Sequence, residues 1–379
     1  MSENEIAFGS ISAFDAAAIR GTPSSMTWLS ATHFVVVWQK YSNDSGYARV
    51  GSISGTTITW GAEAQFQDAG GYEDWWGPVI RPRVRKIDDT HVLIVWKDDG
   101  GSWGLIATIS DLSISFGTIT GLLDVLLTYI DAAILDSTHA VITYVLGGNV
   151  KARILTISGT NITSWGTEYT ASTDAGYETD VDVLDSTHFV VTWRRTTCES
   201  KIGEVTGTAI SFGTQAQIYN ATGNLMDVAA LDSTHFVVFW CDANISYKYG
   251  RARAASISGT TITYGSAVEV TAAVTYFPAV AKYDSTTFLM SYERDAETAG
   301  ACQFGTIAGT AITIVEGVYD YNPSPTGRTN ANEIAVLSTE LCVVAFRADD
   351  LGTGAGYANA GIIGEAPPAG IPRTFAVIF

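Results

Sequence analysis

The five histidines of this 379-residue chain are the side chains best suited to chemistry, and all five occupy one position of a repeated segment. An imidazole can transfer protons near neutral pH or bind a metal ion. The histidines are His33, His91, His139, His188 and His235. A ring of repeats would hold them too far apart to share one ion or substrate. We therefore expect each to have a structural role, bonded across its own turn or to the neighbouring repeat.

The histidines belong to the consensus Leu-Asp-Ser-Thr-His-Phe-Val-Val-x-Trp. In the copies with histidine the closing aromatic is Trp38, Trp96, Tyr144, Trp193 and Trp240. Two weaker copies close at Tyr292 and Phe346. Successive closing aromatics are 58, 48, 49, 47, 52 and 54 residues apart. Seven copies with a period near fifty predict a repeat architecture, in which these aromatics have a structural role.

Each repeat predicts four antiparallel strands, named a to d in chain order. Strand b is the β-branched run after the histidine, and strand a precedes the Asp-Ser-Thr turn. Strands c and d flank Ser-Gly-Thr, a hairpin signal within a second repeated segment, Gly-Ser-Ile-Ser-Gly-Thr-Thr-Ile-Thr-Trp-Gly at residues 51–61. Four-stranded units at this period predict an all-β fold, a seven-bladed β-propeller of four-stranded antiparallel blades.

The two ends of the chain predict how the ring closes. The last repeat supplies strands a, b and c and then reaches the Pro-rich segment 366–379. At the other end, residues 6–10 match the strand d pattern of residues 262–266. We predict that this N-terminal segment completes the last blade, which removes two exposed edges. The propeller then spans residues 1–365, and the tail, residues 366–379, either packs on its own disc or docks as a strand on another subunit.

Composition and motifs exclude several classes of function. A formal net charge of −18 and a pI near 4.5 argue against binding to nucleic acid or to an anionic membrane. No apolar run has the length of a transmembrane helix, and the acidic first residues lack the apolar region of a signal peptide. The four cysteines show neither zinc spacing nor a disulfide pattern. The sequence contains no recognisable nucleophile–base pair, phosphate loop or metal cluster, so we predict no cofactor, no metal and no enzymatic activity.

The loops predict which face of the disc binds a ligand. The a–b and c–d turns lie on one face and repeat almost unchanged, whereas the b–c and d–a loops on the other face vary. Aromatic rings beside carboxylates or arginines in variable loops suit sugars, which stack on the rings. The predicted ligand-binding residues are Tyr72, Trp75, Trp76, Trp103, Arg194, Tyr247, Tyr249 and Tyr276. The alternative is that Trp75 and Trp76 plug the channel mouth or pad the long loop that contains them.

The two repeated segments resemble the repeats of large virion-associated and tail-fibre-like proteins of bacteriophages, over about residues 6–365. The shared motifs are scaffold turns and strands, so the resemblance is specific to the repeat type and not to an activity. It implies a virion surface module that decorates the particle or contacts host-surface glycans, with other virion subunits bound through residues 366–379. It also implies localisation to the virion after folding in the host cytoplasm, in agreement with the expected lack of a signal peptide.

The favoured hypothesis is therefore a non-enzymatic propeller on a phage-like particle, with no nucleic-acid binding and no membrane insertion. Two alternatives stay open at this point. One is a free, lectin-like carbohydrate-binding propeller. The other is a glycan-cleaving enzyme whose carboxylates lie on the variable face.

Overall fold

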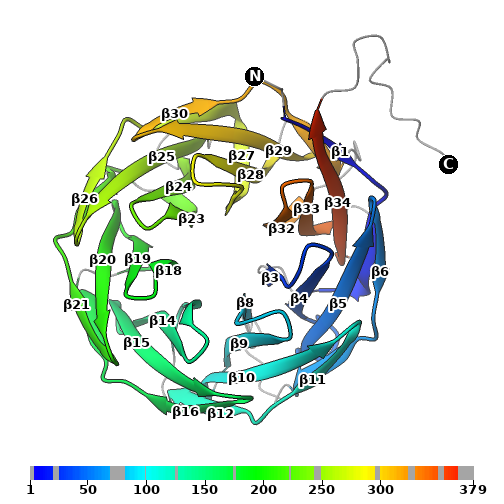
Figure 1. The fold of residues 1–379 in the computed structure, drawn as a ribbon, viewed down its shortest axis with the longest axis horizontal. Coiled ribbons are helices and arrows are strands. Elements are labelled where there is room, and N and C mark those ends of the chain that lie inside the picture. Colours follow the sequence, from blue (N-terminus) through cyan, green and yellow to red (C-terminus); the bar gives the residue numbers. More distant parts are fainter. Residues whose placement is uncertain are drawn as a thin grey trace.

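The chain forms a closed ring of seven blades around a central opening (Figure 1), which confirms the predicted propeller. The computed structural model describes residues 4–19, 25–68, 82–98, 100–123, 127–173, 176–221, 223–242, 249–294, 299–322, 329–348 and 354–365. Every regular element in these ranges is a β-strand. The same ranges hold no helix of the length and hydropathy that crossing a membrane requires.

In each blade the strand order from the channel to the rim is a, b, c, d. Strands a are β3 (Ser25–Trp28), β8 (Arg83–Lys86), β13 (Ile130–Asp136), β18 (Glu178–Asp185), β23 (Gly223–Asp232), the second part of β27 (Val268–Lys282) and β32 (Thr329–Ser338). Strands b are β4 (His33–Gln39), β9 (His91–Asp98), β14 (His139–Leu146), β19 (His188–Arg194), β24 (His235–Asp242), β28 (Thr287–Arg294) and β33 (Leu341–Ala348). Strands c are β5 (Gly46–Ser54), β10 (Gly101–Ser110), β15 (Asn149–Ser158), β20 (Cys198–Thr206), β25 (Tyr249–Ser258), β29 (Ala299–Ala308) and β34 (Ala355–Glu365).

Strand d is divided into two short strands in every blade, both paired with strand c. In blades 1 to 4 the two parts are β6 (Thr57–Trp60) and β7 (Ala64–Gln67), β11 (Ser113–Phe116) and β12 (Thr120–Leu123), β16 (Asn161–Trp165) and β17 (Tyr169–Ser172), and β21 (Ala209–Phe212) and β22 (Ala216–Tyr219). In blades 5 to 7 they are β26 (Thr261–Tyr264) with the first part of β27, β30 (Ala311–Ile314) with β31 (Tyr319–Asn322), and β1 (Asn4–Phe8) with β2 (Ser12–Ala18).

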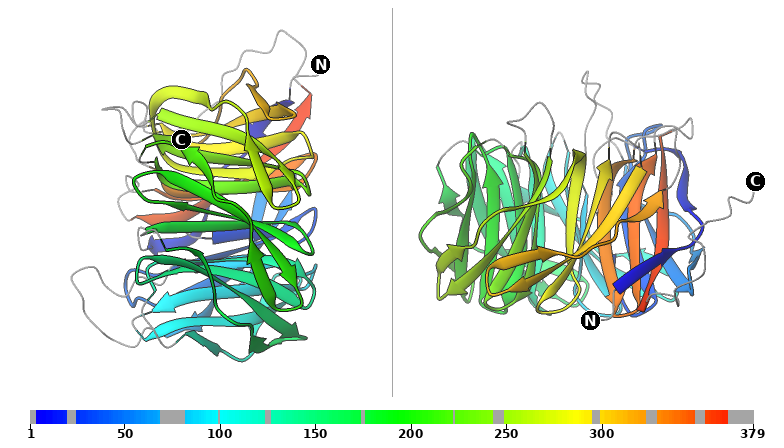
Figure 2. Two further views of the ribbon diagram at one scale, coloured as in Figure 1. Left: turned by 90° about the vertical axis from the view of Figure 1, so that its left-hand side faces the viewer. Right: turned by 90° about the horizontal axis from the view of Figure 1, so that it is seen from above.

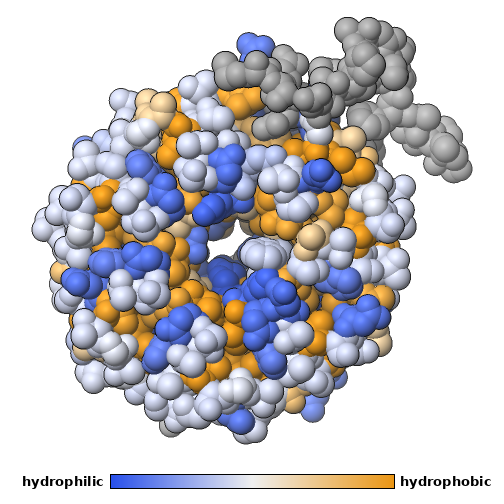
Figure 3. All heavy atoms as spheres, viewed as in Figure 1, coloured by the Kyte–Doolittle hydropathy of each residue, from blue (hydrophilic) through white to orange (hydrophobic). Residues whose placement is uncertain are grey.

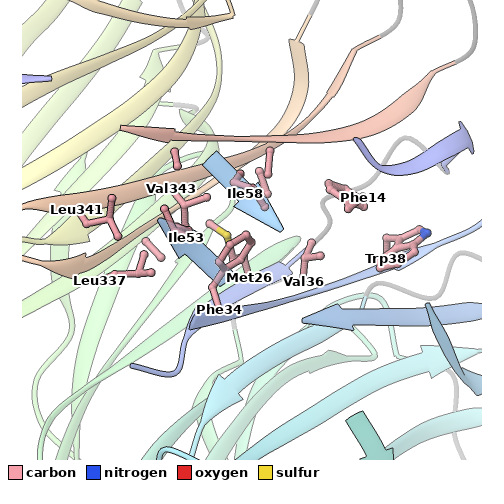
Figure 4. Close-up of a cluster of buried hydrophobic side chains, with 14 of the residues drawn as sticks. Phe14, Met26, Phe34, Val36, Trp38, Ile53, Ile58, Leu337, Leu341 and Val343 are labelled. Carbon is pink, nitrogen blue, oxygen red and sulfur yellow. The ribbon is translucent and has the colours of Figure 1, made fainter. Parts of the chain in front are cut away.

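The middle of strand b is largely apolar on both faces because each blade packs face to face with two neighbours. In β19 the run from Phe189 to Trp193 is buried on both sides of the sheet. Seven apolar clusters fill the seven blade junctions. Figure 4 shows the cluster between the last blade and the first, which includes Phe14, Phe34 and Trp38.

The glycine that ends the first part of strand d lies against the c–d turn of the next blade. A Cβ built on Gly61 would lie 1.8 Å from the carbonyl oxygen of Leu112, and one on Gly265 would lie 2.0 Å from that of Thr310. The same contact recurs at Gly9, Gly117, Gly166 and Gly213. The Trp-Gly and Ser-Gly-Thr segments therefore recur together because the glycine of one blade makes room for the turn of its neighbour.

The predicted closure by the N-terminal segment is confirmed. β1 pairs with β34 in antiparallel register, Ile6 opposite Ile363, and β2 pairs with the beginning of the same strand. Asn4 pairs with Glu365 at the end of the ladder, where the other blades have a two-residue turn. The chain therefore enters and leaves the disc at one point of blade 7.

At four blade junctions a side chain of strand c donates a hydrogen bond to the backbone of strand d in the preceding blade. The acceptor is each time the carbonyl oxygen of the residue at the bulge of strand d. The bonds are Arg49 Nη1 to Phe14 O (2.9 Å), Lys201 Nζ to Ala171 O (2.7 Å), Arg253 Nη1 to Ile218 O (2.6 Å) and Asn359 Nδ2 to Tyr321 O (2.8 Å). These bonds join the outer strands of neighbouring blades.

In the edge-on views of Figure 2 the strands run from one face of the disc to the other. The a–b and c–d turns therefore share one face, which we call the constant face. The b–c and d–a connections share the opposite face, which we call the variable face.

Candidate functional site

The histidines lie on the constant face, each bonded inside its own a–b turn. Nδ1 of His91, His139, His188 and His235 lies 3.0 to 3.2 Å from an oxygen of the aspartate three residues earlier. In the first blade Ser30 takes the place of the aspartate, with its Oγ 3.3 Å from Nδ1 of His33. Because each imidazole is bonded in a separate blade, the five do not form a common site.

The turn aspartates are held as carboxylates. Burial raises the pKa of Asp185, but hydrogen bonds from the backbone and hydroxyl of Thr187 and from His188 outweigh it, so the net pKa lies below the ordinary value. The pKa values of Asp88, Asp136 and Asp232 are also lowered, by the equivalent hydrogen bonds in their own turns. These groups stabilise the fold above the ordinary carboxyl pKa, and their contribution is lost as the pH falls through the lowered values.

The closing aromatics of strand b are buried in the blade junctions. Trp38, Trp96, Tyr144, Trp193 and Trp240 are at most 1% exposed. The indole Nε1 of Trp38 donates to Asp15 Oδ2 at 2.8 Å, and the hydroxyl of Tyr144 donates to Glu168 Oε2 at 2.6 Å. These side chains are enclosed between the blades, so neither face of the disc presents them to a ligand.

The predicted ligand-binding residues fall into two groups. Tyr72, Trp75, Trp76 and Tyr247 lie outside the described residues. The sequence places Trp103, Arg194 and Tyr249 in b–c loops, whereas the structure places them within β10, at the end of β19 and at the start of β25. Strands b and c continue pairing beyond the apolar run, as Asp98 opposite Gly101 shows, so the connecting loops are shorter than the sequence pattern indicates.

Two of these residues already have partners in the fold. Trp103 is half-buried, lies opposite Trp96 and packs on the core between blades 1 and 2. Arg194 forms a two-point ion pair with Glu178, Nε to Oε2 at 2.8 Å and Nη2 to Oε1 at 3.1 Å. Tyr249 and Tyr276 are on adjacent strands β25 and β27, at the junction of blades 5 and 6. The structure therefore brings Tyr249 and Tyr276 near each other and leaves Trp103 and Arg194 in other blades.

Two strongly exposed aromatics on the variable face were not in the predicted set. Tyr41 follows strand b of the first blade, and Tyr177 precedes strand a of the fourth; each is 59% exposed. The backbone of Tyr177 is fixed by a hydrogen bond from its N–H to the carbonyl of Arg194, at 2.9 Å. An exposed tyrosine on a fixed backbone presents an apolar ring with a polar hydroxyl, which suits a hydroxyl-rich ligand.

The channel wall carries a second group of residues that the sequence pattern did not predict. They lie eight residues before each histidine or its replacement, on the strands that line the opening. In blade order they are Ser25, Arg83, Asp131, Asp180, Asp227, Ala279 and Glu333. Figure 3 shows hydrophilic residues around the central opening. The fixed distance to the histidine is the signal that could have identified them.

The channel aspartates bond each blade to the next. Val181 N–H donates to Asp131 at 3.3 Å, Val228 N–H to Asp180 at 2.8 Å, and Val280 N–H to Asp227 at 2.6 Å. Ser25 accepts the equivalent bond from Val84 N–H at 3.2 Å. Asp182, two residues after Asp180, accepts a further bond from Ala230 N–H at 2.8 Å. A side chain of one inner strand thus satisfies a backbone group of the neighbouring inner strand.

Arg85 of blade 2 contacts blades 1, 3 and 7 along the channel wall. Its Nε donates to the carbonyl of Ala132 and its Nη2 to Asp131 Oδ1, both at 2.8 Å. Its Nη1 donates to Ser25 Oγ at 3.3 Å and lies 3.8 Å from Glu333 Oε1. Burial raises the pKa of Asp131, but the charge of Arg85, a hydrogen bond with Asp180 and the charge of Arg83 outweigh it and hold the pKa below the ordinary value.

The other channel carboxyls hold protons more tightly than usual. Burial, followed by the charge of Asp227, raises the pKa of Asp180 well above its usual range. Burial also raises the pKa of Asp182 to about 6 and that of Glu333 to about 7. Among the described residues no group of three or more His, Cys, Asp or Glu side chains is arranged to hold a metal ion. In the channel wall, the carboxyl and guanidinium groups are instead partners of one another.

Comparison with known proteins identifies the fold and no family. No family model matches the chain, and no curated protein matches it. A triple arginine-to-alanine mutant of AofleA from Arthrobotrys oligospora is 9% identical, with a TM-score of 0.50 over 84% of this chain and 92% of that one. A functionally unknown protein from Desulfotomaculum acetoxidans is 11% identical, with a TM-score of 0.55 over 79% and 89% of the two chains. The NanB sialidase from Streptococcus pneumoniae is 12% identical, with a TM-score of 0.52 over 94% of this chain and 70% of that one. These likenesses show that the chain has a propeller fold that is also found in a sialidase.

Proposed function

We propose that the protein is a non-enzymatic binding propeller, carried on the surface of a phage-like particle, that contacts host-surface glycans through its variable face. The observation that carries the proposal is the division of the disc into two faces. The constant face repeats one turn structure, whereas the variable face carries Tyr41 and Tyr177, exposed and in different blades. The sequence adds Trp75 and Trp76 to the longest connection on the same face.

The particle part of the proposal rests on the resemblance of the repeats to phage virion proteins. On this proposal residues 366–379 dock on another virion subunit, and the disc is part of a decoration or fibre module. Purified particles of the source phage should then contain the protein in a fixed ratio to the other structural proteins. A protein found only in the soluble fraction would contradict the particle part and leave the glycan part standing.

Glycan binding can be tested with two double substitutions on the variable face and one control substitution on the constant face. We expect the wild-type protein to bind a subset of a glycan array, and both Tyr41→Ala/Tyr177→Ala and Trp75→Ala/Trp76→Ala to lower binding at least tenfold with unchanged melting temperatures. The reason is the loss of ring faces on which a sugar stacks. Trp28→Ala is the matched control, because Trp28 is 42% exposed and next to an a–b turn on the constant face. A silent array with folded protein would contradict a sugar site, and a lowered melting temperature with unchanged binding would assign Trp75 and Trp76 to packing.

A glycan-cleaving enzyme is the second candidate, because the NanB sialidase shares the fold. Glycoside hydrolysis needs two carboxyls placed about 5 to 9.5 Å apart on either side of the scissile bond. Glu178 and Asp242, at the variable ends of β18 and β24, are instead ion-paired with Arg194 and Arg251. Asp180 is in hydrogen-bond contact with Asp131 and Asp227, which is closer than the spacing of the two carboxyls in a glycosidase. Release of new reducing ends from host polysaccharide would favour the enzyme over the binding protein.

A further inference from the structure

The channel wall of blades 3, 4 and 5 contains three carboxyls that follow one another around the ring. Asp131 of β13 bonds to the N–H of Val181, the residue next to Asp180. Asp180 of β18 bonds to the N–H of Val228, the residue next to Asp227. The carboxyl of Asp180 lies within hydrogen-bonding reach of both Asp131 and Asp227, so one proton on Asp180 can be donated to either. A hydrogen bond between two carboxyl groups requires a proton on one of them.

The channel wall that contains Asp180 carries further charged groups. Its own strand adds Asp182, β8 adds Arg83 and Arg85, and β32 adds Glu333. Ser25 and Thr27 of β3 and Ala279 and Ala281 of β27 occupy the corresponding positions without charge. If all groups were ionised, five carboxylates would face two guanidinium groups, an excess of three negative charges. Like charges at such short range oppose each other, and burial strengthens the repulsion.

We propose that Asp180 is a proton-dependent clasp, which joins blades 3, 4 and 5 while its carboxyl is protonated and loosens them when the proton leaves to solvent. In the protonated state the Asp180 O–H donates to a neighbouring carboxylate, and its other oxygen accepts from Val228 N–H. After deprotonation three adjacent carboxylates have no hydrogen to share. The clasp is independent of the proposed glycan site, since it lies in the channel wall and not on the variable face.

The direction of the pH effect follows from the raised pKa values. A carboxyl whose pKa is raised by folding stabilises the native state fully below its unfolded pKa, and that contribution is lost as the pH rises through the folded pKa. For Asp182 and Glu333 the loss extends from the ordinary carboxyl range to about pH 6 and about pH 7. Asp180 acts in the same direction. The lowered pKa values of the turn aspartates act in the opposite direction and only in acid.

The sharpest test compares two amides in the wild-type protein. Val228 N–H donates to Asp180, and Val84 N–H makes the equivalent bond to Ser25, which does not titrate. In NMR spectra from pH 4 to 9, we expect the Val228 amide shift to titrate well above the ordinary aspartate range and the Val84 amide shift to stay constant through the same inflection. A Val228 titration near pH 4, or none at all, would overturn the clasp.

Asp180→Asn tests the same clasp through stability. Asparagine keeps an oxygen for Val228 N–H and supplies N–H donors to both neighbouring carboxylates at every pH. We expect the melting temperature of the wild-type protein to fall by several degrees between pH 5 and 8. That of the variant should fall less, because only the contributions of Asp182 and Glu333 remain. Asp232→Asn, in a constant-face turn, should keep the full wild-type decline. Equal declines in Asp180→Asn and the wild type would refute the proposal, and the amide titration decides the matter if this variant does not fold.

Discussion

A chain that lacks residues 1–18 is expected to lose cooperative unfolding or to melt at a temperature at least about 10 °C lower, because strand d of the last blade is removed. The deletion uncovers the edge of β34 and removes Phe14 and Ile6, which are 0% and 5% exposed. It also removes the acceptors of Trp38 and Arg49 in the first blade. Buried groups that lose their partners, together with lost core volume, account for the largest effects of sequence changes on stability.

A circularly permuted chain is the matched control for this deletion. Joining Glu365 to Asn4 through Gly-Thr restores the turn of the other blades, and new ends can be opened between Gly159 and Thr160 in the third blade. We expect this permutant to unfold cooperatively near the wild-type temperature, as measured by circular dichroism. A truncated chain that melts like the wild type would show that the ring does not depend on β1 and β2.

Gly265→Ala is expected to lower the free energy of unfolding by at least about 2 kcal/mol, because one methyl group is forced into a close junction between blades. The added Cβ would lie 2.0 Å from the carbonyl oxygen of Thr310, and that carbonyl belongs to a tight turn that cannot move freely. The backbone of Gly265 is outside the left-handed region, so the effect comes from the contact and not from φ.

The control for this substitution is Gly364→Ala in β34, where a Cβ would meet no atom within 4 Å. Urea unfolding of both variants should show a large loss for Gly265→Ala and a change within about 0.5 kcal/mol for Gly364→Ala. Equal stability of the two variants would mean that the repeated glycine is not required by the turn of the next blade.

The contacts of the channel carboxyls could not be predicted from the sequence. Asp131 and Asp227 each precede a short apolar run, whereas Asp180 alternates with Glu178 and Asp182 in β18, and in an isolated sheet all of these side chains would point to solvent. Only the ring places a neighbouring strand edge within 3.3 Å of each carboxylate. Their raised and lowered pKa values depend on burial, on one another and, for Asp131 and Asp227, on Arg85, and these groups come from different blades.

The variable face shows a second limit. Trp103 and Arg194 are near the ends of strands, so the pattern predicted loop positions for them. In the structure their strands continue to pair, and Arg194 finds Glu178 across the sheet. The exposures of Tyr41 and Tyr177 depend on how the surrounding strands pack, which no local pattern contains.

The sequence by itself determined the number of blades, the four strands of each blade, the turns and the closure by the N-terminal segment. It could do so because these features are local and are written seven times, with apolar and turn residues at fixed spacing. The tertiary structure alone decided which carboxyls hold protons, which glycines touch a neighbouring blade and which aromatics remain exposed. The physical reason is that burial, charge and contact at these positions arise between blades, from residues about fifty or more positions apart in the chain.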